Sequence, residues 1–230
     1  MSERGDWQAA FAARCMEPDA AMGLIESDDL VYVNVGTPAA VTVLLEIRSQ
    51  ELGGLDMRLL GPADEPLRTS GRDAGEREIE LVIGEASRSS HDEKRSTYLP
   101  NTFMLGMKAF DAGREEARMP DVNLVTCSAP NDAGFVHFGP AQWQKKSYLK
   151  RCPKTIGFID HHMQPVHGDV WAHVSEFTAF VDGILPPPPD VEAIQARIES
   201  EAPPENREKL IALSRVVVRE RLAPVADSFH

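Results

Sequence analysis

The chain has 230 residues, of which 42% are hydrophobic, and its 36 acidic and 24 basic side chains give a net charge of −12 at pH 7. This apolar content is enough for the core of one domain or two small ones, and it argues against a disordered chain. The acidic balance disfavours nucleic acid or a membrane surface as the main partner, and no apolar run reaches the roughly 20 residues of a membrane-spanning helix.

The first residues, Met1 to Asp6, are polar and lack the apolar stretch of a secretory signal, so we expect a cytoplasmic protein. Cys15, Cys127 and Cys152 are odd in number and widely spaced, which favours reduced thiols over a disulfide framework. No CxxC pair is present to indicate a zinc site.

Strand-like apolar runs alternate with helical patterns, which predicts an α/β fold: an open, mostly parallel sheet with helices on both faces. The first unit is a short helix over 17–25, a buried strand over 30–35 and a helix over 38–49. We expect Thr37 to be the N-cap of that helix and Pro38 its first residue.

The remaining elements follow the same alternation. Residues 62–78 are rich in Gly, Pro and charge and predict an excursion from the core, and residues 128–139 are turn-rich. We expect an α/β domain over 1–185, and over 186–230 a proline linker with C-terminal helices that pack on the same domain. The predicted strands are 55–60, 79–83, 121–127, 155–160 and 176–181, and the predicted helices are 103–110, 141–150, 191–201 and 204–222.

The turn Gly36-Thr37-Pro38 is the first candidate site, because a helix that begins after a buried strand directs free N–H groups towards a carboxylate or phosphate. Only one glycine is present, so neither the dinucleotide fingerprint nor a P-loop is matched. An ordinary turn between strand and helix is the alternative.

Four histidines and two aspartates lie within residues 160–173, and imidazole and carboxylate are both ligands for zinc or iron. This cluster, from His161 to His173, allows a metal-dependent hydrolase as one hypothesis. The spacing lacks the HExxH pair of a helix, and its Pro and Gly indicate a loop, so a polar turn is the alternative.

A run of basic residues without an intervening acid is the third feature, and it could receive an anionic cosubstrate or form a solvated helix face. No GxSxG motif marks a serine nucleophile. The run comprises Lys145, Lys146, Lys150, Arg151 and Lys154.

Three stretches carry a resemblance to a known family. They are Glu17 to Ala21 continuing to Gly36-Thr37-Pro38, then residues 121–139, then His167-Gly168-Asp169 with His173-Val174-Ser175-Glu176. In this order they resemble the amino-terminal half of the acetyl-CoA hydrolase and 4-hydroxybutyrate CoA-transferase family, within the type I CoA-transferases. In the second stretch Asn131 replaces the family's usual Asp, and Ala133 replaces its usual His.

The resemblance implies a CoA-transferase domain of the NagB/RpiA-like type and chemistry in which a glutamate carboxylate attacks an acyl-CoA thioester. The family's glutamate lies in its carboxyl-terminal domain, and Glu176 belongs to a different motif, so no catalytic residue is expected on this chain. The resemblance therefore implies one subunit of a split CoA-transferase or acyl-CoA hydrolase, inactive alone, in a hetero-oligomer with a second subunit that carries the glutamate. Acyl-CoA and a carboxylic acid are the implied substrates, and coenzyme A takes part as a substrate, not as a cofactor.

The resemblance also implies a set of substrate-binding residues beside the cleft. A non-catalytic CoA-ester-binding or regulatory module remains an alternative because of Asn131 and Ala133, and the metal-dependent hydrolase is another. The implied substrate-binding residues are Gly36, Thr37, Pro38, Asn131, Gly134, His167 and Gly168.

Overall fold

The structure is a computed structural model, and it describes two-thirds of the chain. Residues 62–76 of the predicted excursion, the proline linker, Gly36 and the bulk of the two C-terminal helices lie outside the described residues. Residues 77 and 78 of that stretch belong to a strand of the sheet, so the predicted excursion was wrong at its end. Within the described part, no helix is both long and apolar enough to cross a membrane. The described residues are 6–34, 37–60, 77–80, 88, 91–94, 96–100, 105–114, 117–185, 196, 199–200, 203–204, 207–208 and 211.

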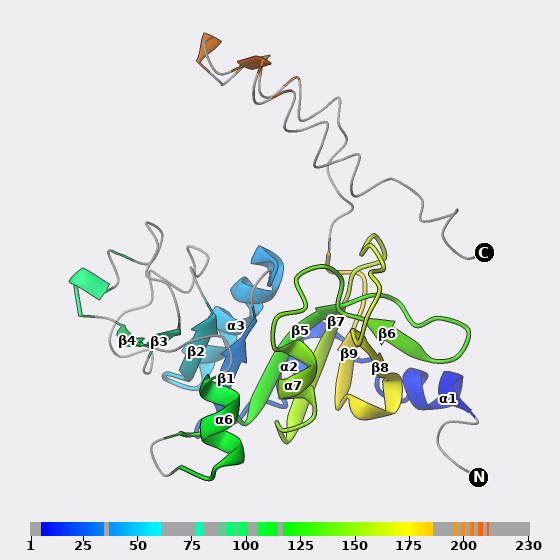
Figure 1. The fold of residues 1–230 in the computed structure, drawn as a ribbon, viewed down its shortest axis with the longest axis horizontal. Coiled ribbons are helices and arrows are strands. Elements are labelled where there is room, and N and C mark those ends of the chain that lie inside the picture. The colour runs from blue at the N-terminus through cyan, green and yellow to red at the C-terminus, as the bar shows by residue number, and fades with distance from the viewer. Residues whose placement is uncertain are drawn as a thin grey trace.

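Seven strands, each parallel to its neighbours, form the main sheet in the order β4-β3-β2-β1-β5-β7-β9 (Figure 1). The open parallel sheet predicted from the sequence is therefore confirmed. Its central strands are wholly buried, which explains why they appear as continuous apolar runs. The strands are β1 (Leu30–Val33), β2 (Asp56–Leu60), β3 (Arg77–Glu80), β4 (Thr97–Leu99), β5 (Val122–Cys127), β7 (Lys154–Ile159) and β9 (Ala179–Val181).

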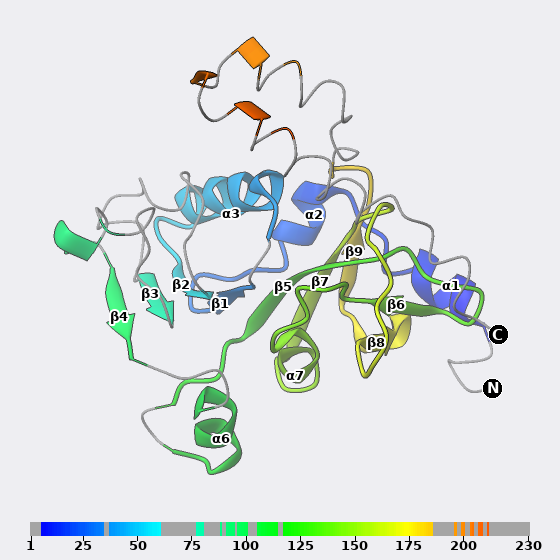
Figure 2. The ribbon, with the colours of Figure 1, turned by 45° about the horizontal axis from the view of Figure 1, so that its top comes forward.

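Helices cover both faces of this sheet (Figure 2). One face carries α2 (Pro18–Met22) and α3 (Ala39–Glu51), and the other carries α6 (Leu105–Asp111) and α7 (Lys145–Leu149). Alternation along β1 fits this arrangement, because Val31 and Val33 join the cluster under α2 and α3 while Tyr32 faces the other way. Tyr32 stacks on Tyr148 of α7 with ring centroids 3.7 Å apart.

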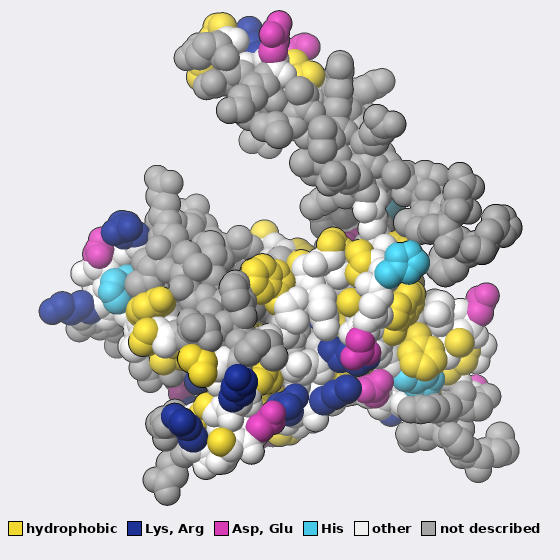
Figure 3. Space-filling view, in the orientation of Figure 1, with side chains coloured by type: hydrophobic (Ala, Val, Ile, Leu, Met, Phe, Trp, Pro, Cys, Tyr) yellow, Lys and Arg dark blue, Asp and Glu magenta, His cyan; other side chains and the backbone are white. Residues whose placement is uncertain are grey.

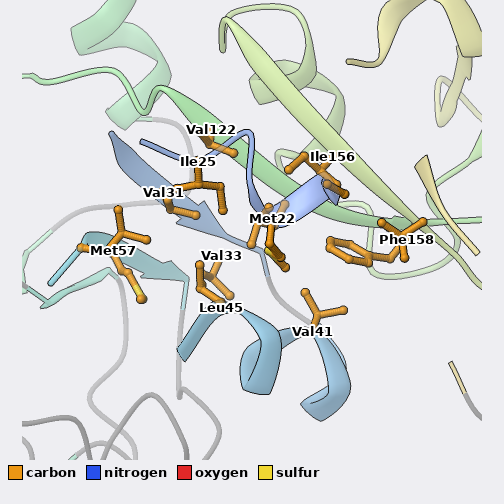
Figure 4. Close-up of a cluster of buried hydrophobic side chains, with 14 of the residues drawn as sticks. Met22, Ile25, Val31, Val33, Val41, Leu45, Met57, Val122, Ile156 and Phe158 are labelled. Carbon is orange, nitrogen blue, oxygen red and sulfur yellow. The ribbon is translucent and has the colours of Figure 1, made fainter. Parts of the chain in front are cut away.

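The larger core cluster lies between the sheet and the two helices α2 and α3 (Figure 4). Its side chains come from both helices and from strands β1, β2, β5, β7 and β9, so this cluster joins sequence segments that are far apart. Figure 4 labels Met22, Ile25, Val31, Val33, Val41, Leu45, Met57, Val122, Ile156 and Phe158.

A two-stranded antiparallel ribbon lies beside the main sheet, and the sequence did not predict it. Strands β6 (Phe135–His137) and β8 (Trp171–His173) form it, and the 3₁₀ helix η2 (Val174–Glu176) follows β8. The helix α1 (Trp7–Ala12) was also not predicted, and its Trp7 and Phe11 pack on a second apolar cluster that contains the ribbon.

The largest boundary corrections concern three predicted elements. The helix predicted over 141–150 is confined to α7, and the strand predicted over 176–181 begins only at Ala179, because residues 174–176 form η2. Thr37 is not the N-cap of α3. Pro38 holds that position, and the Thr37 hydroxyl instead donates a hydrogen bond to the Asn34 carbonyl oxygen at 2.6 Å.

Candidate functional site

The sheet has a topological switch point between β1 and β5. From β1 the chain continues through α3 to β2 on one side, and from β5 it continues through α7 to β7 on the other. Because α3 and α7 cover opposite faces, the connections that leave the carboxyl ends of β1 and β5 turn to opposite sides of the sheet (Figure 2). In open α/β sheets this is the place where ligands bind.

Asn34 ties the two strands together at this point. Its side chain is buried, and its Nδ2 donates to Asn123 Oδ1 at 2.6 Å and to the Leu124 carbonyl oxygen at 2.9 Å. Both acceptors belong to β5. The Asn34 Oδ1 is buried and accepts no hydrogen bond from any residue that the structure describes.

Of the predicted turn Gly36-Thr37-Pro38, the structure describes Thr37 and Pro38, which lie between Asn34 and α3. Both are partly buried. They therefore lie at the carboxyl edge of β1, where the sequence placed them, although the Thr37 hydroxyl bonds to backbone and caps no helix.

Asn131 and Gly134 meet in one tight turn between β5 and β6. The Asn131 Oδ1 accepts hydrogen bonds from the backbone N–H groups of Ala133 and Phe135, each at 3.0 Å. A carboxylate oxygen would accept the same two bonds, so the turn forms with Asn in place of the Asp that the resemblance leads one to expect.

Gly134 is required in this turn by two conditions. Its φ is +77°, and a Cβ there would lie 2.6 Å from Cβ and Cγ of Trp7. Trp7 packs across the turn and donates from its indole nitrogen to the Asp132 carbonyl oxygen at 3.0 Å. The structure thus gives Asn131 and Gly134 roles in shaping the turn.

Glu176 is occupied by capping. Its Oε1 accepts the backbone N–H of His173 at 2.8 Å, while the Nδ1 of His173 accepts the backbone N–H of Ser175 at 3.2 Å. These bonds form a capping box at the start of η2. The motif His173-Val174-Ser175-Glu176 is therefore a local folding signal.

His167 and Gly168 lie in the exposed loop between β7 and β8, and Gly168 has a φ of +119°. The next residue, Asp169, forms an ion pair with Lys146 of α7, and this hydrogen bond lowers the pKa of the Asp169 carboxyl. The loop is thereby attached to α7.

The four histidines of residues 160–173 do not gather into one group. His161 bonds Asp182 at 2.8 Å, His162 and His167 are exposed, and His173 is buried in its capping box. Among the described residues, no three His, Cys, Asp or Glu side chains lie together as a metal site. The ligand set that suggested a metal-dependent hydrolase is therefore not assembled.

The basic run does not form a patch. On the face shown in Figure 3, basic and acidic side chains are interspersed along the rim that holds α6 and α7. Arg151 binds both carboxylate oxygens of Asp111 at 3.0 Å, and Lys154 bonds Asp29 at 2.9 Å.

Lys145 differs from the rest of the run because only 2% of it is exposed. Burial lowers its pKa from 10.5 to about 8, and the neighbouring Cys127 opposes this shift. Burial also raises the pKa of the Cys127 thiol well above its ordinary value. Neither reading of the basic run, an anion-binding patch or a solvated helix face, separated Lys145 from its neighbours. The one available signal was its spacing of four residues from the buried Leu149 on α7.

Two further titratable groups lie near Cys127. Asp160 follows β7, and its backbone N–H donates to the Cys127 carbonyl oxygen at 2.8 Å. His137 of β6 is buried, burial lowers the pKa of its imidazole, and its Nδ1 accepts the Gly139 N–H at 3.2 Å. The carboxyl end of β5 thus gathers a thiol, an ammonium, an imidazole and a carboxylate.

All three cysteines are free thiols, as the sequence predicted.

No protein-family model matches the chain. The chain is 23% identical over 185 residues to the 4-hydroxybutyrate coenzyme A transferase of Clostridium kluyveri, and the match covers 79% of this chain and 42% of that protein. The chain therefore spans less than half the length of this curated relative.

Solved structures share the fold. RipA from Yersinia pestis superposes with a TM-score of 0.66 at 18% identity, over 86% of this chain and 50% of RipA. A 4-hydroxybutyrate CoA-transferase from Porphyromonas gingivalis gives 0.50 at 17% identity, over 84% and 45%. A chain of the decarboxylase AibA/AibB gives 0.52 at 12% identity, over 90% of this chain and 98% of that one.

Proposed function

Because this chain is related to the CoA-transferase family over part of that family's length, we propose that it is one subunit of a two-chain CoA-transferase or acyl-CoA hydrolase. The observation that carries the proposal is the sequence match to a 4-hydroxybutyrate coenzyme A transferase across 79% of this chain. In this proposal a partner chain supplies the catalytic glutamate.

Two observations support a separate partner. The chain matches 42% of the relative, so the greater part of that protein has no counterpart in the match. The match to the AibA/AibB chain covers 98% of that chain and 90% of this one. That chain is therefore a precedent for this fold in a chain of similar size.

The state of Glu176 agrees with a nucleophile located elsewhere. Its carboxylate accepts a backbone hydrogen bond and lies just before β9, while Thr37 and Pro38 lie after β1. In a parallel sheet, residues that precede the strands lie at their amino ends, and residues that follow the strands lie at the opposite, carboxyl ends. Glu176 is therefore remote from the edge at which we propose that substrate binds.

The reaction proposed for the complex proceeds in covalent steps. A glutamate oxygen of the partner attacks the thioester carbonyl carbon, and the carbon–sulfur bond breaks. The CoA thiolate departs, and an acyl-glutamyl anhydride is formed. The thiolate then attacks the glutamyl carbonyl and releases the acyl group as a carboxylate. In a transferase, an acceptor carboxylate then attacks the glutamyl-CoA thioester and expels the CoA thiolate, which attacks the acceptor carbonyl of the new anhydride to give the product acyl-CoA and the free glutamate. In a hydrolase, water attacks the glutamyl-CoA thioester and releases CoA and the free glutamate.

In this scheme the present chain supplies part of the substrate surface. We assign Thr37 and Pro38, at the carboxyl edge of β1, to that surface, together with Gly36, which lies outside the described residues. His167 and Gly168 are assigned to it from the loop after β7.

The test is reconstitution. The tagged chain is expressed in its native host, copurifying polypeptides are identified by mass spectrometry, and CoA exchange between acetyl-CoA and a carboxylate is measured for each chain and for the mixture. Activity only in the mixture, with a borohydride-sensitive glutamyl thioester mapped to the partner, supports the proposal. Full activity of this chain alone, or a thioester mapped to it, overturns the proposal.

A further inference from the structure

Trp143 is half exposed in a strained stretch of backbone. It lies in the connection between β6 and α7, and 49% of its surface is exposed. Its φ is +38°, a left-handed value that is unfavourable for a residue with a bulky side chain. Of the non-glycine residues that the structure describes, only Lys94 also has a positive φ. Both features are unfavourable for the free chain, because the backbone is strained and half of a large apolar ring remains in water.

A second unfavourable group lies next to Trp143. The side-chain oxygen Oε1 of Gln142 is buried and accepts no hydrogen bond from any residue in the described ranges. A buried acceptor without a donor costs free energy on folding. When a fold keeps backbone strain and an unsatisfied polar group in one short segment, that segment is a candidate for a role other than folding.

Trp143 lies at the carboxyl edge of the main sheet. Helix α7 begins two residues after it and leads to β7, which is parallel to β5. A helix that joins two parallel strands starts near the carboxyl end of the first strand and ends near the amino end of the second. The interaction of Lys145 with Cys127, the last residue of β5, agrees with this placement. Trp143 therefore shares an edge of the sheet with Thr37 and Pro38, which we assigned to the substrate surface.

We propose that Trp143 inserts into an apolar pocket of the partner subunit and anchors it on the carboxyl edge of the sheet. This inference rests on the proposed function, in which the partner's glutamate reaches substrate at that edge. The chain matches 42% of its curated relative, so a part larger than the match is left for the partner to supply. Tryptophan is among the residues enriched at binding hot spots, and burial of the ring in the complex would offset the strain of its backbone.

Ile47 provides a matched comparison on the opposite face. Its exposed fraction is also 49%, but it lies inside α3, which covers the face of the sheet away from α7 (Figure 2). Its backbone is ordinary helix, and it lies towards the end of α3 that is remote from Thr37 and Pro38. Exposure alone therefore does not distinguish Trp143, whereas strain and position do.

The experiment uses the full chain and the partner polypeptide that restores CoA exchange in the reconstitution. Isothermal titration measures the dissociation constant of the pair, and melting temperatures confirm that each variant is folded. Trp143→Ser should weaken binding at least about tenfold, as expected for a hot spot. Trp143→Phe keeps an aromatic ring and should stay within about threefold of wild type. Ile47→Ser should stay within about twofold. Unchanged binding by Trp143→Ser, or an equal loss in Ile47→Ser, overturns the proposal.

A second measurement on the unmutated chain keeps the proposal falsifiable if Trp143→Ser folds poorly. Hydroxyl-radical oxidation, read out by mass spectrometry, should slow several-fold at Trp143 when the partner is bound, and should be unchanged at Ile47 in the same sample. Unchanged oxidation of Trp143 in the complex overturns the proposal. So does protection by coenzyme A without the partner, which would show a ligand contact, or protection that grows with the concentration of this chain alone, which would show self-association.

The two proposals fail in different ways. If a polypeptide restores CoA exchange but binds Trp143→Ser as tightly as wild type, only the role of Trp143 is overturned. If no polypeptide from the native host restores CoA exchange, the two-chain enzyme and the docking role of Trp143 are both overturned.

Discussion

The side-chain amide of Asn34 donates to the side-chain oxygen of Asn123 at 2.6 Å and thereby joins the ends of β1 and β5 at the switch point of the sheet. Asn34→Ala removes both hydrogen bonds from this side chain to buried acceptors on β5, so it should lower the free energy of unfolding by about 1–3 kcal/mol. Urea denaturation measures this. Gln50→Ala, which removes an exposed hydrogen bond to Glu46, is the control and should change stability by less than about 0.5 kcal/mol. Equal effects of the two variants would contradict the role of Asn34.

Lys145 gives a pH-dependent prediction. Between about pH 8 and pH 10.5 the unfolded chain holds a proton on Lys145 that the folded chain has lost, so this residue adds stability as the pH rises. Lys145→Met should be more stable than wild type by up to about 3 kcal/mol at pH 7, and the advantage should shrink towards pH 10. Urea midpoints at several pH values measure the difference, which Lys150→Met should not show. A Lys145→Met variant that is less stable at every pH would show that the ammonium is already compensated.

Gly134 should tolerate substitution less well than a glycine in open space. Gly53 has nearly the same φ, +73° against +77°, but nothing lies within 4 Å of a Cβ built on it. Gly53→Ala should therefore cost only the left-handed backbone, about 1–2 kcal/mol. Gly134→Ala adds a clash with Trp7 and should cost at least about 1 kcal/mol more. Thermal unfolding of both variants checks this, and equal losses would show that Trp7 moves aside freely.

Glu176 should prove structural. Glu176→Gln keeps an oxygen that can accept the His173 N–H, whereas Glu176→Ala loses the cap and should destabilise the chain by about 1 kcal/mol. In the reconstituted complex, Glu176→Gln should keep kcat within about threefold of wild type, because the proposal places the nucleophilic glutamate on the partner. An amide cannot replace a nucleophilic carboxylate, so this variant tests whether Glu176 is the nucleophile. A loss of activity by orders of magnitude in a stably folded Glu176→Gln variant would identify Glu176 as the nucleophile.

The turn at Asn131 should accept a carboxylate. Asn131→Asp keeps an oxygen for the N–H groups of Ala133 and Phe135 and should change the free energy of unfolding by less than about 0.5 kcal/mol. Asn131→Ala removes the acceptor and should cost about 1–2 kcal/mol. Chemical denaturation of the two variants side by side distinguishes a requirement for an acceptor from a requirement for an amide.

The sequence predicted the main sheet well because its central strands are buried on both faces. Continuous apolar runs marked β1, β5 and β7 to within two residues at each end. The three-residue strands β4, β6 and β8 were missed, because so few residues carry no readable period. Their pairing depends on contacts such as that between Phe135 and His173, which are distant in the chain.

The candidate site was harder to predict for a similar reason. Thr37 and Pro38 were located from a local signal, the turn between a strand and a helix. The one local signal that separates Lys145 from Lys146 is its spacing of four residues from Leu149, and packing over β5 decides which lysine is buried and which is paired. A run of basic residues in the sequence shows only which residue types are present. Tertiary contacts decide which of its side chains is buried.

The turn at Asn131 also bears on how distant relatives of this chain are found. What the backbone requires there is one oxygen facing two N–H groups, and both amide and carboxylate side chains provide it. A signature that insists on aspartate would therefore pass over chains built on the same loop. One written in terms of acceptor atoms and a following left-handed glycine would retain them.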